Sequence, residues 1–240
     1  MPAVTDLVGP AGPLEAIVDH PAEGVPLRAA VVFAHPHPQF GGTLHTKAVY
    51  QGAKGLARIG CAVLRFNFRG VGRSAGEFDR GPGELRDFAA ALDYMAAKHP
   101  GARLWAAGFS FGAWVALEVG ATDDRVSALI GIAPPVATSV SGERSGASRE
   151  GRAQRSELGG VQGTPPFTMT YDFPNTLASA KPKFFVQGEA DEVCPLEAMW
   201  QFYGRLEEPK ELVVIDGADH LFEGRTSEVG EAIEELLGDF

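Results

Sequence analysis

Short apolar runs alternate along the chain with longer segments of helical periodicity. Buried strands are predicted at Ala29–Ala34, Ala62–Phe68, Leu104–Ala107, Ala128–Ile132, Phe184–Gln187 and Glu211–Ile215. An earlier run, Leu14–Asp19, predicts an edge strand. Helices are predicted at Thr43–Ile59, Gly83–Lys98, Phe111–Val119, Leu196–Leu206 and Glu228–Leu237. Because strands alternate with helices, the pattern predicts an α/β fold with a mostly parallel central sheet and helices on both faces.

One segment, at about 138–168, breaks this alternation. Its middle, Ser139–Gly163, is rich in Ser, Gly, Arg and Glu and has almost no large apolar side chain. Such a segment cannot bury enough apolar surface to pack by itself. We therefore expect a single domain over residues 1–240 that carries a mobile insertion. Loops that leave the carboxyl ends of parallel strands overhang the active-site crevice, so the insertion is either a cover for that crevice or a solvated excursion.

The net charge, the N-terminal segment and the cysteines indicate which partners and which cellular compartment to expect. The chain has 21 Lys plus Arg against 31 Asp plus Glu, a formal net charge of −10, which argues against a nucleic-acid partner. No secretory signal is visible in Met1–Pro10, and no apolar run is long enough to span a membrane. Two cysteines, Cys61 and Cys194, are expected to be free thiols. The expectation is a cytoplasmic protein, either a monomer or a small homo-oligomer.

The sequence Gly108-Phe109-Ser110-Phe111-Gly112 follows a predicted strand and precedes a predicted helix. This is the context in which a G-x-S-x-G motif forms a nucleophile elbow. The two glycines permit a tight turn that raises the serine hydroxyl above the sheet. The start of the following helix offers backbone N–H groups to a developing oxyanion, with Phe111 as the first donor. Ser110 is therefore the predicted nucleophile.

A serine hydroxyl needs a general base, and the base needs an orienting carboxylate. Of the histidines, His220 lies in a loop after a late predicted strand, the position that the chain order Ser…Asp…His requires. The acid is expected in the loop after the preceding strand, where Asp191 is the predicted residue and Glu189 and Glu192 are the local alternatives.

Two further acids, Asp216 and Asp219, lie close to His220 in sequence. Such near neighbours are more consistent with a role in shaping the loop, although either could serve as the orienting acid.

A second oxyanion donor is expected from the loop after the first central strand, which spans His35–Gly42. Its two prolines carry no N–H, so by elimination the backbone N–H of His37 is the predicted partner of Phe111 N–H, with Gln39 as second choice. Two histidines two residues apart also raise the question of a metal site. No further histidine or acidic cluster accompanies them, so no metal is expected.

Several motifs together resemble those of a known family. They are HPHPxxGGT at His35–Thr43, FNFRGVGRSxG at Phe66–Gly76 and GxSxG at Gly108–Gly112, and the match resumes at Lys181–Pro195 and Asp216–Phe222. With these motifs the chain resembles the α/β-hydrolase superfamily, and within it a bacterial branch of small hydrolases related to dienelactone hydrolases. The usual nucleophile of dienelactone hydrolases is cysteine, whereas this chain has serine.

The resemblance implies carboxylesterase-like chemistry without a cofactor, with Ser110, Asp191 and His220 as the triad. A small-molecule ester cleaved through an acyl-enzyme is the predicted substrate. A thioesterase or an amidase would use the same three residues. A peptidase is less favoured because no gating domain accompanies the catalytic one. A non-catalytic binding protein on the same scaffold would normally lack a triad member, and here all three are present.

Overall fold

The computed structural model describes residues 3–136, 140–141 and 168–240. Two short strands, β9 (Val140–Ser141) and β10 (Thr168–Met169), pair antiparallel at the two ends of the predicted insertion. The rest of that insertion lies outside the described residues. No helix within the described ranges is long and apolar enough to cross a bilayer.

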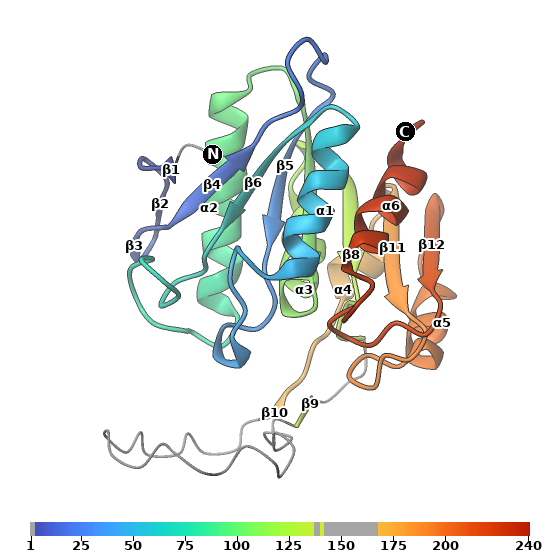
Figure 1. Ribbon diagram of the computed structural model, residues 1–240. Coiled ribbons are helices and arrows are strands. Elements are labelled where there is room, and N and C mark those ends of the chain that lie inside the picture. The colour runs from blue at the N-terminus through green and yellow to red at the C-terminus, as the bar shows by residue number, and fades with distance from the viewer. Residues whose placement is uncertain (1–2, 137–139, 142–167) are drawn as a thin grey trace, which may run out of the picture.

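The centre of the fold is an eight-stranded sheet in the order β1-β4-β6-β5-β7-β8-β11-β12 (Figure 1). The strands are β1 (Ala3–Val4), β4 (Ala16–Asp19), β5 (Ala29–Ala34), β6 (Cys61–Phe66), β7 (Arg103–Phe109), β8 (Val126–Ile132), β11 (Lys183–Gly188) and β12 (Lys210–Ile215). Neighbouring strands are parallel from β6 through β12, whereas β1, β4 and β6 pair antiparallel. The predicted α/β fold with a mostly parallel sheet is confirmed.

Helices cover both faces of the sheet, and each face has its own apolar core (Figure 1). On one face α1 (Lys47–Arg58) and α6 (Thr226–Leu237) pack against each other and onto the sheet. On the other face lie α2 (Pro82–Lys98), α3 (Phe111–Thr122) and α5 (Leu196–Tyr203). The central strands β5, β6 and β11 are buried along their whole length, which explains why β5 is apolar throughout and the other two are mostly apolar.

Several predicted elements differ from the structure in their ends, and two differences have a local cause. The helix predicted from Thr43 begins at Lys47. The N–H of Thr43 donates to Thr46 Oγ1 and the N–H of Thr46 donates to the carbonyl of Thr43, and these two hydrogen bonds hold the chain in a turn before the helix. The predicted edge strand, β4, is not at the edge, since the two-residue strand β1 pairs with its outer side.

Several short elements have no counterpart in the prediction. They are the hairpin strands β2 (Val8–Gly9) and β3 (Gly12–Pro13), the 3₁₀ turn η1 (Pro38–Phe40) and the helix α4 (Pro174–Ala178). Elements of two to five residues are too short to show a periodicity, so the pattern of apolar residues carries no signal for them.

Candidate active site

Ser110 lies in the sharp turn between β7 and α3 and has φ +54° and ψ −120°. A positive φ is costly for a residue with a side chain, on the order of 1–3 kcal/mol. The flanking glycines explain how the turn closes. A Cβ at Gly108 would collide with the carbonyl of Gly112, and a Cβ at Gly112 would collide with the carbonyls of Ala34 and His35. The sequence motif therefore produces a strained turn that presents the serine at the carboxyl edge of the sheet.

The structure brings the three predicted triad side chains together. Asp191 follows β11 and His220 follows β12, and these neighbouring parallel strands end at the same edge as β7. His220 Nδ1 is 2.8 Å from Asp191 Oδ2, and His220 Nε2 is 3.0 Å from Ser110 Oγ. Asp191 and Ser110 are buried, and the His220 side chain is 14% exposed. A chain of hydrogen bonds thus runs from a buried carboxylate to a serine hydroxyl.

The acceptor character of Asp191 sets the tautomer of the imidazole. A carboxylate only accepts, so the 2.8 Å contact assigns the ring proton to His220 Nδ1. The other nitrogen, Nε2, is then an acceptor and faces the hydroxyl of Ser110. This is the protonation state in which a histidine can take a proton from a serine.

Four hydrogen bonds hold the Asp191 carboxylate. Oδ1 accepts the backbone N–H groups of Val193, at 2.9 Å, and Cys194, at 2.7 Å. Oδ2 accepts His220 Nδ1–H and also Gln187 Nε2–H, at 3.0 Å. Gln187 is fully buried at the end of β11, and its Nε2 also donates to the carbonyl of Cys194, at 2.7 Å.

Sequence reasoning missed Gln187. The signal was a single polar residue at the end of the apolar run Phe184–Gln187, because a polar side chain in a strand buried on both faces must find hydrogen-bond partners.

Two of the four competing acids bond backbone groups, and the other two are exposed. Glu189 Oε2 accepts the backbone N–H of Gly217 at 2.9 Å and so ties together the loops after β11 and β12. Asp219 Oδ1 accepts the N–H of Glu223 at 2.9 Å, which is the loop-shaping role predicted for it. Glu192 and Asp216 are exposed. His220 therefore bonds Asp191 and none of these four.

The loop after β5 lies beside the serine turn. The rings of His37 and Phe111 are 5.2 Å apart, and Phe111 is the first residue of α3. The first N–H groups of a helix have no partner within the helix, which suits Phe111 as an oxyanion donor. In the facing loop, the N–H of Gln39 already donates to His37 Nδ1 at 3.2 Å. This bond favours His37 over Gln39 as the second donor.

His35 has a structural role that the sequence did not reveal. The ring is fully buried, its Nδ1 donates to the carbonyl of Pro36 at 2.6 Å, and its Nε2 accepts the N–H of Phe68 at 3.1 Å. The neutral ring thus ties the loop after β5 to the chain after β6. Burial lowers the pKa of both His35 and His37 to about 4.

We expect the free energy of unfolding to fall as the pH is lowered from about 6.5 towards about 4. The unfolded chain protonates these histidines near pH 6.5, whereas the folded chain resists protonation until about pH 4. For His35 the loss amounts to roughly 3 kcal/mol over that range. Urea unfolding between pH 4 and 7 measures it. The His35→Gln variant should lose less stability over the same pH range, and an equal slope would contradict this account.

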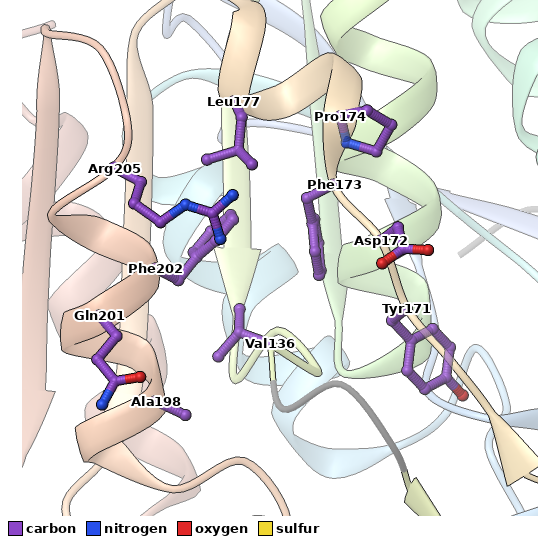
Figure 2. Close-up of a pocket in the computed structure, with 10 residues that line it drawn as sticks. All are labelled: Val136, Tyr171, Asp172, Phe173, Pro174, Leu177, Ala198, Gln201, Phe202 and Arg205. Atoms are coloured by element: carbon purple, nitrogen blue, oxygen red, sulfur yellow. The ribbon is translucent and has the colours of Figure 1, made fainter.

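A pocket of about 770 Å³ lies between α4, α5 and the segment that enters α4 (Figure 2). Its lining combines apolar and aromatic side chains with polar and charged ones, and consists of Val136, Tyr171, Asp172, Phe173, Pro174, Leu177, Ala198, Gln201, Phe202 and Arg205. None of the three triad side chains lines it. The ring of Tyr171, which lines the pocket, is 6.3 Å from that of Phe111.

Comparisons with known proteins agree with this architecture. Residues 26–151 match the family described as Serine aminopeptidase, S33. An uncharacterized protein of Rickettsia prowazekii is 33% identical over 209 residues, which cover 85% of this chain and 76% of that protein. An alpha-beta serine hydrolase homologue from Coxiella burnetii has 33% identity and a TM-score of 0.78 over 98% of this chain and 97% of its own. A serine hydrolase without lid from Xanthomonas campestris has 33% identity and a TM-score of 0.76, with coverages of 98% and 92%.

Proposed function

This chain belongs to the S33 family of serine hydrolases with the α/β-hydrolase fold, and we propose that it cleaves carboxylic esters through an acyl-enzyme formed on Ser110. The observation that carries the proposal is the hydrogen-bonded chain from Asp191 through His220 to Ser110 Oγ, with distances of 2.8 and 3.0 Å.

Each residue has a step in the proposed reaction. His220 Nε2 takes the proton of Ser110 as its Oγ attacks the ester carbonyl carbon, and Asp191 stabilises the resulting imidazolium. Backbone N–H groups of Phe111 and His37 receive the oxyanion of the tetrahedral intermediate. His220 then gives its proton to the departing alcohol. Water, activated by the same nitrogen, releases the acid and restores the serine.

Oxygen esters are favoured over amides because an alkoxide leaves more readily than an amine anion and needs less help from the enzyme. A thioester or an amide would use the same groups, and the family description adds an aminopeptidase as an alternative. The peptidase alternative would require a group that holds the α-amino end of a peptide. The charged side chains Asp172 and Arg205 line the pocket in Figure 2, and none of the three triad side chains lines it.

The substrate class is tested by a panel in which one acyl group is joined to different leaving groups. We expect the oxygen ester to give a higher kcat/KM than the matched thioester and anilide, and an aminoacyl anilide to be the poorest substrate. Labelling with a fluorophosphonate reports an activated serine whatever the substrate. Faster cleavage of the aminoacyl anilide would replace the ester assignment, and absence of labelling would contradict an activated Ser110.

A further inference from the structure

Beside the candidate triad lies a third side chain that can bind a metal. Cys194 follows Asp191 in the same loop, and one ligand atom each from Asp191, Cys194 and His220 lie within 4.8 Å of one another. These atoms are a carboxylate oxygen, a thiol sulfur and an imidazole nitrogen. Together they form a ligand set that Zn²⁺ and related thiophilic cations bind. Asp191 and Cys194 are buried, and the ring of His220 is partly exposed.

A second observation points to a cation at the same place. The amide nitrogen of Gln187 is 3.0 Å from Asp191 Oδ2, and the oxygen of the same amide is buried. That oxygen, Oε1, has no hydrogen-bond partner among the described residues. An unpaired buried acceptor costs free energy. The site thus offers three metal ligands, and the amide that carries this unpaired oxygen donates to one of them.

The loop that holds these ligands is already ordered. Asp191 Oδ1 accepts the backbone N–H groups of Val193 and Cys194, and Gln187 Nε2 holds the carbonyl of Cys194. Tetrahedral coordination at Zn–N and Zn–O bonds of about 2.1 Å separates two ligand atoms by roughly 3.4 Å. Asp191 Oδ2 and His220 Nδ1, now 2.8 Å apart, would have to move apart by about half an ångström.

We propose that Asp191, Cys194 and His220 form an inhibitory site for a thiophilic divalent cation such as Zn²⁺, in which binding of the cation switches off the triad. The inhibitory effect rests on the proposed function of these residues, whereas the binding itself does not. The site is regulatory and supplies no cofactor to the reaction.

The inhibition follows from the tautomer of His220. The cation needs the lone pair of Nδ1, and this nitrogen now carries the proton that it donates to Asp191. On binding, that proton moves to Nε2, and Cys194 loses its thiol proton to solvent and binds as thiolate. Nε2 then donates to Ser110 Oγ instead of accepting from it, so it cannot act as the base. The cation removes catalysis without occupying the position of the ester.

The test uses the full chain and titrates Zn²⁺ into an ester hydrolysis assay in a buffer that does not chelate metals. We expect kcat to fall with little change in KM, and activity to return with a chelator. Each variant is compared with its own metal-free activity. Cys194→Ala should need at least ~10-fold more Zn²⁺ for the same fractional inhibition. The matched control is Cys61→Ala, since Cys61 is also buried but lies in β6.

A second measurement reports binding independently of activity. Cd²⁺ bound to a thiolate gives an ultraviolet charge-transfer absorption, which we expect in the unmodified chain and in Cys61→Ala but not in Cys194→Ala. Absence of this absorption in the unmodified chain would overturn the site, whether or not the protein hydrolyses esters. Equal inhibition of the unmodified chain and Cys194→Ala would also overturn it, because the cation would then bind without the thiol. Binding of Cd²⁺ at Cys194 by a protein that cleaves no ester would instead count against the proposed function alone.

Discussion

Replacement of Ser110 by alanine is expected to leave the protein folded and to lower kcat/KM for short-chain p-nitrophenyl esters by at least ~10³-fold. The substitution removes the oxygen that lies 3.0 Å from His220 Nε2, and the site has no second hydroxyl on that nitrogen in the described residues. What remains is binding and oxyanion stabilisation. Initial rates measured against ester concentration give the change in kcat/KM.

The matched control is Ser127→Ala, because the Ser127 hydroxyl donates to the carbonyl of Leu104 and not to His220. This variant should hydrolyse the esters at close to the rate of the unmodified chain and should still be labelled by a fluorophosphonate. Retention of more than a tenth of the activity by Ser110→Ala would show that the nucleophile is another residue.

The central strands were predictable because they are buried on both faces. A strand such as β5 can hold apolar side chains at every position, and Ala29–Ala34 is apolar throughout. The ends of elements were less predictable because local hydrogen bonds decide them. Hydrogen bonds between Thr43 and Thr46 hold a turn there, so α1 begins later than the spacing of apolar residues predicts. The position of β4 inside the sheet depends on β1, which is only two residues long.

The loops that meet at the candidate site were predictable, but not every side chain that each loop contributes. Parallel strands end at one edge, so residues placed after β7, β11 and β12 must come close together wherever these strands lie in one sheet. The choice between Asp191 and Glu189 was not fixed by this argument, because both lie in the loop after β11. Side-chain direction favours Asp191, since Asp191 points to His220 and Glu189 points to Gly217.

The polar residues that support the site were the least predictable. Gln187 and His35 are buried, and they bond a nearby side chain or backbone groups. The N–H of Phe68, which is distant from His35 in sequence, reaches that ring only once β5 and β6 have paired. A polar residue in an apolar run signals that a partner is needed, but it does not identify the partner.

The second large effect is expected for Asp191→Asn, which should reduce kcat/KM for the same esters by ~10³- to 10⁴-fold with only a small change in KM. The backbone N–H groups of Val193 and Cys194 need an acceptor, so the asparagine oxygen is expected to face them. Its NH₂ group then faces His220 Nδ1. That nitrogen becomes an acceptor, the ring proton moves to Nε2, and the base for Ser110 is lost.

The same orientation explains why stability should also decrease. In Asp191→Asn the NH₂ group would meet Gln187 Nε2, so two donors would replace the present 3.0 Å hydrogen bond. Leaving such a buried group unpaired costs about 1–3 kcal/mol. Asp191→Asn should therefore unfold at lower urea concentration and also lose activity. Glu189→Gln, in the same loop, keeps an oxygen that can accept from Gly217 and should lose neither property. If Glu189→Gln were the inactive variant and Asp191→Asn kept its rate, the orienting acid would be Glu189, and Asp191 would serve only to shape its loop.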